Sequence, residues 1–542
     1  MLNRLLFLTH RWTGVALALF MLLWFASGLV IVYSSSINQS RDQQLAHAEP
    51  LRLEANWLSF GAAWERSREA HAADKGGKTS HDETGIVEAR LARQGGLPLW
   101  LAEDTRGQHY AISAIDGHLW RATSEDALKI AADWLIHEGR VKEAGDLRHV
   151  GIQEKGASIL RGQDTLAPFH RISLQNILGG EIIVSATTGE VVQVSNALER
   201  GTYWAGNWLH LFRFFDSAGF GSARGDVLMW SIIINFVSCV TGLIVGWLRW
   251  RPGWGGKPTY KEGRVHPYRA FWFRWHFWAG LIGGIVATLW AFSGVVSSLQ
   301  SSLYSPAAPT RDALAQYYGA GIPEKIRNWQ PEAGELAKVP AAADIVQLAW
   351  RRLGDDSVLL AHKANGERIA LDAGDFSETK LTAAVWRLAG VDAGTETEVS
   401  RITEYDHYFY LRHRRSAYDR PLPALLYKLN DNAATHVYLD PQDGRVLLRN
   451  DAGRRQYRWL FSALHHWDLP GLYRRPVWDV WMLIWIAFGL TLGTSSVVLG
   501  VKRLKVTFIR WDRAKENRKS KGAPEKEIET APALTLQTNA EG

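Results

Sequence analysis

The sequence HRWTGVALALFMLLWFASG, residues 10–28, returns 266 positions later as HFWAGLIGGIVATLWAFSG, residues 276–294. The two stretches align without a gap and share residues of mostly rare types at identical spacing. A fixed offset of this kind indicates that the chain arose by duplication of one unit. The shared residues are His10, Trp12, Gly14, Trp24, Ser27 and Gly28, matched by His276, Trp278, Gly280, Trp290, Ser293 and Gly294.

A second match joins two later stretches of the chain. Together the two matches predict that each repeated unit consists of a helix that leaves the cytoplasm, an external domain and a helix that returns to the cytoplasm. Because both copies run in the same direction, we expect a pseudo-twofold axis along the membrane normal. Leu209-His210 aligns with Leu464-His465, and Gly246 with Arg249 aligns with Gly500 with Arg503 when one deletion is allowed.

The repeats lie in long apolar stretches. Four segments contain no Asp, Glu, Lys or Arg: residues 12–40, 227–248, 275–310 and 480–501. Each reaches the roughly 20 residues that a helix needs to cross about 30 Å of hydrocarbon. A chain of 542 residues also exceeds a single core, and its one cysteine, Cys239, excludes a disulfide framework. These features predict a membrane protein and exclude a plain cytosolic enzyme.

Basic residues beside the apolar stretches predict the orientation. Residues 249–274 carry seven Lys and Arg against the single acid Glu262, and the tail after Val501 opens with five more. Short flanks rich in Lys and Arg stay in the cytoplasm, so both termini and the middle loop are expected there. The same rule accounts for the net charge of +7, so we expect no nucleic-acid partner.

The expected fold class is an α-helical membrane protein with α+β periplasmic domains, in the inner membrane of a Gram-negative cell. Its four transmembrane helices come from a duplicated helix–domain–helix unit. The predicted boundaries are helix 1–37, periplasmic region 38–225, helix 226–249, cytoplasmic loop 250–270, helix 271–301, periplasmic region 302–475, helix 476–502 and cytoplasmic tail 503–542.

The long segments between the helices alternate strand pairs with helices. Alternating apolar residues around a turn that ends in glycine predict hairpins at residues 111–119, 182–192 and 436–447. Helical patterns lie at residues 124–138, 341–353 and 381–388. We expect each periplasmic region to form small α+β units with antiparallel sheets, about two of them in the first region.

These motifs resemble a known family. The hairpins with Asp or Thr before Gly resemble the PepSY domain. The sequences HRWTG at residues 10–14 and HFWAG at residues 276–280 resemble the helices of the PepSY-associated transmembrane family, and RPLP at residues 420–423 resembles part of its second external domain. The resemblance covers about residues 1–505. It implies a role in iron uptake, in which some members reduce ferric siderophores in the periplasm.

Four of the 18 histidines stand out because the repeat pairs them. His10 and His276 lie at the cytoplasmic starts of the outward helices, and His210 and His465 precede the inward helices on the external side. Residues related by the axis would face each other at equal depth. Two neutral imidazoles that face each other across a four-helix bundle can form a haem site. His466 rivals His465, and the sequence does not decide between them.

We predict two haems, one for each histidine pair. They would be b-type, because the sequence has no C-x-x-C-H motif for covalent attachment. His10 is separated from Gly28 by about 27 Å of helix, so it cannot share a haem with His210. The preferred pairs are His10 with His276 and His210 with His465. Ser27-Gly28 and Ser293-Gly294 are expected to permit close helix packing rather than to bind anything. The expected haem-pocket lining is Trp12, Gly14, Trp278 and Gly280.

Two functional hypotheses remain. The first is a haem-dependent reductase of ferric siderophores or other ferric chelates, which receives electrons from a quinol or a separate reductase because the cytoplasmic parts are too short for a flavin or nicotinamide domain. The second is a membrane-anchored PepSY module that binds or regulates a protease or peptide partner without redox activity. The duplicated His-x-Trp-x-Gly unit favours the first, since an anchor does not need a histidine at the same depth twice.

Overall fold

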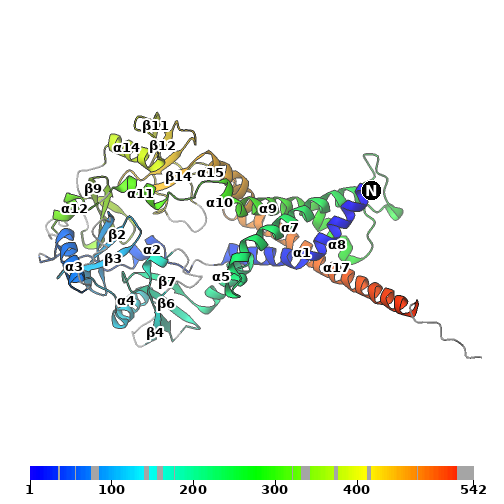
Figure 1. Cartoon of the computed structure of the whole chain (residues 1–542), viewed down its shortest axis with the longest axis horizontal. Coiled ribbons are helices and arrows are strands. Elements are labelled where there is room, and N and C mark those ends of the chain that lie inside the picture. Colours follow the sequence, from blue (N-terminus) through cyan, green and yellow to red (C-terminus); the bar gives the residue numbers. More distant parts are fainter. Residues whose placement is uncertain are drawn as a thin grey trace, which may run out of the picture. The chain divides into compact units, whose positions relative to one another are not determined.

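Figure 1 shows the computed structural model of the chain. Its residues form two compact units, each described separately below. The helical unit comprises Met1–Leu22, Val237–Ile285 and Ala487–Gly542, and the mixed unit comprises Leu23–Phe236 and Val286–Ile486. The structure describes residues 1–34, 37–54, 56–74, 85–139, 146–154, 163–175, 177–319, 321–330, 342–371, 376–411, 417–472 and 474–521.

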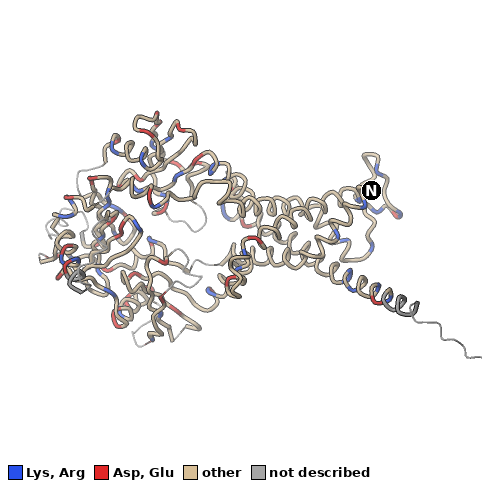
Figure 2. The backbone as a smooth tube through the Cα atoms, in the orientation of Figure 1, with Lys and Arg blue, Asp and Glu red and all other residues tan. Residues whose placement is uncertain are grey.

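Three helices are long and apolar enough to cross a membrane, namely α1 (Leu2–Tyr33), α7 (Gly221–Arg249) and α17 (Val477–Lys521). A fourth candidate span is a pair of shorter helices, α8 (Phe271–Ile282) and α9 (Gly284–Ser298), bent by 62°. Figure 2 shows few charged residues along the apolar parts of these helices. The predicted multi-pass membrane protein with mixed α+β segments is therefore confirmed, whereas the third expected helix is not one straight rod.

The break between α8 and α9, which together form the third span along the chain, lies at Gly283. A Cβ atom at this position would come 2.7 Å from the Cβ of Phe488 on α17 and 2.9 Å from the carbonyl oxygen of Ala279. Only glycine permits such a close approach of two helices. The bend is thus attributable to a Gly-Gly pair packed against a neighbouring helix.

The mixed unit is built around one antiparallel sheet to which both long segments contribute. The strand order is β10-β9-β8-β1-β2-β3. Strands β1 and β8 pair in its centre, with Leu91 opposite Leu348. This corrects the expectation of separate units in each region, because each three-stranded half completes the other. The strands are β1 (Ile86–Gln94), β2 (Leu97–Asp104), β3 (His109–Ser113), β8 (Ile345–Leu353), β9 (Asp356–Lys363) and β10 (Arg368–Ala370).

The predicted helix at residues 341–353 is wrong, because residues 345–353 form strand β8. Side chains on both faces of β8 are buried, including Val346, Leu348 and Trp350. A strand covered on both faces is apolar almost throughout, and its sequence does not alternate. Periodicity alone therefore does not distinguish it from a buried helix.

Two smaller sheets flank the central one, each with a helix on one face. Helix α4 (Ser124–His137) packs on strands β4 (Leu147–Gln153), β5 (Phe169–Leu174), β6 (Gly180–Ser185) and β7 (Val191–Ser195). Helix α14 (Glu378–Ala389) packs on strands β11 (Thr397–Ile402), β12 (Ala424–Leu429), β13 (His436–Leu439) and β14 (Val446–Asn450).

The predicted helices at 124–138 and 381–388 and the hairpins at 182–192 and 436–447 are confirmed. The third hairpin is only partly present, since β3 is followed by one isolated bridge between Ile112 and Leu119. The remaining helices are short. They are α2 (Arg41–Ala46), α3 (Phe60–Asp74), α5 (Ala197–His210), α6 (Phe214–Ser217), α10 (Gln300–Leu303), α11 (Arg311–Tyr318), α12 (Glu324–Asn328), α15 (Ala452–Tyr457) and α16 (Leu464–His466).

Buried ion pairs cross the strands at the centre of the mixed unit. Glu88 on β1 lies directly opposite Arg351 on β8, with Oε1 3.0 Å from Nη2. Glu190, next to β7, lies 2.7 Å from Arg90 and 3.2 Å from Arg41. Burial alone would raise the pKa of Glu190, but Arg90 and Arg41 lower it to about 2. Both carboxylates therefore stay ionised. Glu88 joins the two halves of the chain within the central sheet, and Glu190 ties the end of the neighbouring sheet to β1.

Candidate functional site

The first histidine pair consists of His10 on α1 and His276 on α8, both in the helical unit. Their ring centroids lie 6.2 Å apart. Nδ1 of His10 is 3.1 Å from the carbonyl oxygen of Ser238, and Nδ1 of His276 is 3.2 Å from Oγ of Ser495. Within the described residues, Nε2 of neither ring has a hydrogen bond. This nitrogen of each ring is therefore available to coordinate a metal ion.

Helix α7 approaches the first pair through a glycine. A Cβ atom at Gly242 would lie 2.7 Å from Cε1 of His10. Any other residue there would displace the imidazole, so the close approach requires glycine. The backbone of α7 thereby helps to fix the position of the His10 ring.

The second histidine pair consists of His210, the last residue of α5, and His465 on α16, both in the mixed unit. Their ring centroids lie 6.3 Å apart, almost the same distance as in the first pair. Nδ1 of His210 is 3.0 Å from Oγ of Ser27, and Nδ1 of His465 is 3.0 Å from Oγ of Ser293. Both rings are thus held by a serine at Nδ1, and their Nε2 atoms have no hydrogen bond in the described part of the chain.

The backbone around the second pair is held by two tryptophans. Nε1 of Trp24 donates a hydrogen bond of 3.2 Å to the carbonyl oxygen of His210, and Nε1 of Trp290 donates one of 3.0 Å to that of His465. Trp24 and Trp290 are themselves partners in the 266-residue repeat. The two copies therefore hold their histidines by the same pair of contacts, one to the ring and one to the backbone.

Local sequence places the second pair at the ends of two equally capped helices. The side chain of Asn196 caps α5 fourteen residues before His210, and that of Asp451 caps α15 fourteen residues before His465. Asparagine and aspartate are favoured caps because their side chains accept an otherwise unpaired backbone N–H. The second helix continues through a π-helical turn, Arg458–Ala463, and such turns often occur at functional sites.

The spacing of both pairs fits two imidazoles on one iron. Rings bound to opposite sides of a metal ion have centroids about 6.2 Å apart, because each metal–nitrogen bond measures about 2.0 Å and each nitrogen lies about 1.1 Å from its ring centroid. The measured separations are 6.2 and 6.3 Å. Among the described residues, no group of three or more His, Cys, Asp and Glu side chains could hold a bare metal ion. Two histidines therefore suit a metal whose other ligands come from a macrocycle.

Ser27 and Ser293 were expected to permit close packing, and the structure adds a contact that this expectation did not include. Their hydroxyls contact the second histidine pair, as described above. A hydrogen bond to the second ring nitrogen fixes the tautomer and orientation of a metal-binding histidine. The sequence contained the clue, because both serines keep the same offset as the histidines, but it did not indicate which side chain they meet.

The residues expected to line the first site are only partly near it. Trp12 is 42% exposed, and Trp278 packs against His266 rather than against the first pair. The positions of Gly14 and Gly280 face Ser238 and Leu492. The structure thus does not bring either tryptophan ring against a member of the first pair.

The adjacent residues His465 and His466 have different neighbours. The ring of His465 faces His210 and also stacks on Phe461, with centroids 5.0 Å apart. The ring of His466 meets Phe461 and His465, and its carbonyl oxygen accepts a hydrogen bond from Trp478. The ring of His465 is therefore the one placed against His210 by the measured contact.

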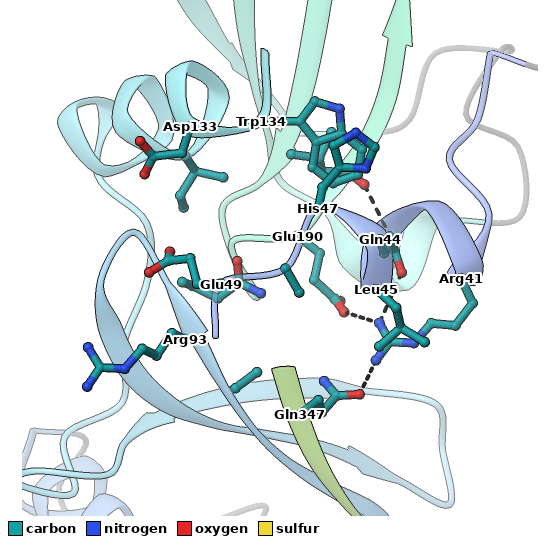
Figure 3. A pocket seen from close by; sticks show the side chains of 15 residues that line it. Arg41, Gln44, Leu45, His47, Glu49, Arg93, Asp133, Trp134, Glu190 and Gln347 are labelled. Atoms are coloured by element: carbon teal, nitrogen blue, oxygen red, sulfur yellow. Dashed lines mark hydrogen bonds and ion pairs between the residues drawn. The ribbon is translucent and has the colours of Figure 1, made fainter. Parts of the chain in front are cut away.

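The mixed unit also contains a small cavity of about 50 Å³ (Figure 3). Arg41, which lines it, bonds to Glu190 and Gln347, and His47 stacks on Trp134 with centroids 4.1 Å apart. These contacts hold the cavity wall together. The cavity is therefore a weaker candidate than the histidine pairs, whose Nε2 atoms remain free.

Comparisons with known proteins bear on the same helices. A family model described as the PepSY-associated TM region matches residues 7–389, which is 383 of the 542 residues. The matched part includes His10, His210 and His276 and ends before His465. No curated protein matches the chain.

Proposed function

Since the chain belongs to the PepSY-associated TM region family, we propose that it is a haem-containing oxidoreductase of the bacterial inner membrane. In this proposal it takes electrons from a quinol or a separate reductase and passes them to a ferric siderophore or other ferric chelate in the periplasm. The observation that carries the proposal is the equal separation within two histidine pairs, whose ring centroids lie 6.2 and 6.3 Å apart.

The four histidines would hold two b-type haems, and haem iron supplies one-electron chemistry when it is bound. The protein's own contribution is to keep each imidazole neutral, oriented and away from water. Ser27, Ser293 and Ser495 contact Nδ1 of their histidines. Each serine hydroxyl donates to a carbonyl oxygen of its own helix, namely that of Leu23, Trp290 or Leu492, so its oxygen can accept the Nδ1–H of the histidine. The tautomer with the proton on Nδ1 leaves Nε2 available to iron.

Charge and symmetry support the arrangement of the proposal. We place both termini and residues 250–270 in the cytoplasm, because residues 249–274 carry seven basic residues against one acid. We further propose that the chain is a duplicated helix–domain–helix unit. The equal contacts of Ser27 with His210 and of Ser293 with His465 support a common origin of the two halves.

A visible spectrum of the detergent-purified protein, recorded before and after dithionite, tests the proposal. We expect a Soret band that shifts on reduction, with sharp α and β bands that indicate low-spin iron with two histidine ligands. Assays with ferric chelates would follow. A colourless protein from haem-replete cells would contradict the proposal and favour a membrane-anchored PepSY module that binds a protease or peptide.

Replacing Ser293 with alanine is expected to weaken haem retention at the second pair by about 10–100-fold, because the Nδ1 hydrogen bond of His465 is lost. The rate of haem transfer to apomyoglobin measures the effect. The matched control is Ser238→Ala, since Ser238 contacts His10 through its backbone carbonyl oxygen and not its side chain. Equal transfer rates for the two variants would show that the Ser293 hydroxyl does not support the site.

A further inference from the structure

Three arginines lie on the helix that leads to His465. They are Arg454 and Arg455 on α15 and Arg458 at the start of the π-helical turn. No acidic residue occurs between Asp451 and Asp468. This stretch therefore presents only positive charge in the mixed unit, immediately before the second histidine pair.

The guanidinium of Arg454 has no hydrogen bond or ion pair among the described residues, and its Nη1 is buried. It lies over the ring of Tyr457, 4.6 Å from the centroid. Burial lowers the pKa of Arg454. The nearest carboxylate, Asp451, is engaged by the backbone N–H of Arg454 and by the hydroxyl of Ser305. A partly buried charge without a partner is costly, unless an anion completes it.

Arg458 is one turn further along and is held by two backbone carbonyl oxygens. Its Nε donates a hydrogen bond of 2.7 Å to His407 and its Nη2 donates one to Asp468, whereas its Nη1 is buried without a partner in the described structure. The guanidinium lies over Trp459 and Tyr410, 4.6 and 5.0 Å from their centroids. Residues four apart share a helix face, so the side chains of Arg454 and Arg458 leave this helix on the same side.

The first copy of the repeat lacks this arrangement. Counted back from the cognate histidine, Arg454 corresponds to Glu199 and Arg458 corresponds to Tyr203. Glu199 is used in the cap of α5, where it accepts the backbone N–H of Asn196. The arginine pair is thus specific to the second copy and is not a requirement of the shared helix–histidine motif.

Stacked rings connect the arginines to the second histidine pair. Tyr457 stacks on Phe461 with centroids 5.2 Å apart, and Phe461 stacks on His465 with centroids 5.0 Å apart. The three residues follow one another at intervals of four. A ligand held by Arg454 over Tyr457 would therefore be joined to His465 by a continuous column of aromatic rings.

We propose that Arg454 and Arg458 form the docking site for a ferric chelate with anionic oxygen ligands, such as carboxylates or catecholates. Arg454 suits such groups because the planar fork of an arginine donates paired hydrogen bonds to two oxygens. Arg458, whose Nε and Nη2 are engaged by carbonyl oxygens, adds positive charge. That a chelate bound at this site is then reduced rests on the proposed function. In that step one electron passes from the donor held by the histidine pair to the chelate, whose Fe³⁺ becomes Fe²⁺, and no bond is broken and no proton moves.

Calorimetric titration of the full-length protein in detergent with the gallium(III)–EDTA anion tests the site without redox chemistry. We expect binding by the parent protein and at least about tenfold weaker binding by Arg454→Gln and Arg458→Gln, because each loses charged hydrogen bonds. Arg454→Lys should recover part of the affinity. Arg510→Gln on α17 removes the same charge elsewhere and should bind as the parent does.

A gallium trihydroxamate of positive net charge should bind more weakly than the anionic chelate. The proposal is overturned if both glutamine variants bind gallium–EDTA like the parent, or if the cationic chelate binds equally well. It is also overturned if phosphate analysis finds a phospholipid whose retention depends on Arg454, since the site would then hold a lipid headgroup. Anion binding by a protein without haem would reject the proposed function and leave the docking site intact.

Discussion

The His276→Ala variant is expected to contain one haem per chain instead of the two that we propose for the parent. Removing one imidazole leaves His10, whose ring centroid now lies 6.2 Å from that of His276, without a partner across the site. The second pair lies in the mixed unit and has its own supporting contacts from Ser27 and Ser293. The pyridine haemochrome assay, normalised to protein, measures the count.

A nearby histidine serves as the control for this experiment. His266 is buried beside Phe277 and Trp278 but is not paired with another histidine in the described structure. The His266→Ala variant should keep two haems. An unchanged count in His276→Ala, or the loss of both haems, would refute the assignment of His10 and His276 to a site of their own.

Replacing Glu88 with alanine is expected to lower the free energy of unfolding of the mixed unit by about 3–5 kcal/mol. The substitution leaves Arg351, which is buried on the facing strand, without its partner 3.0 Å away. Burial alone would raise the pKa of Glu88, but Arg351, Arg90 and Arg41 lower it, so the carboxylate is charged in the folded protein. Denaturant titration of the detergent-solubilised protein, followed by tryptophan fluorescence, measures the change.

An exposed ion pair provides the comparison for Glu88. Glu398 contacts Lys428 at 2.8 Å, with 65% and 40% of their side chains exposed. Loss of such a surface pair costs about 0–1 kcal/mol. A double variant, Glu88→Leu with Arg351→Met, should recover much of the lost stability because neither member of this pair is left buried without the other. Equal effects of Glu88→Ala and Glu398→Ala would show that the central pair does not hold β1 to β8.

The membrane helices were predictable because the bilayer demands long uncharged stretches, and the repeat located the histidines by counting. The 62° bend at Gly283 was not predictable, since it depends on the approach of Phe488 from a helix about 200 residues later in the chain. Local patterns also predicted α4 and α14, whose apolar faces recur at helical spacing. Strand β8 was misjudged because side chains on both of its faces are buried.

The contacts that complete the candidate site were beyond local reasoning. Ser27 and Ser293 were visible as repeated residues, but their hydrogen bonds join positions 183 and 172 residues apart in the chain. In the sequence, Arg454 and Arg458 could be recognised only as positively charged residues. Their significance depends on which nitrogens find partners after folding, and Arg454 is unusual because its guanidinium has no hydrogen bond among the described residues.

The pairing of β1 with β8 has a consequence for biosynthesis. About 250 residues separate the end of β1 from the start of β8, and at about 5–20 residues per second the ribosome needs about 12–50 s to make them. During that time the first half of the chain exposes an apolar strand edge, and unpaired edges of this kind invite aggregation. The nascent protein is therefore expected to depend on holding chaperones at the membrane until the second half arrives.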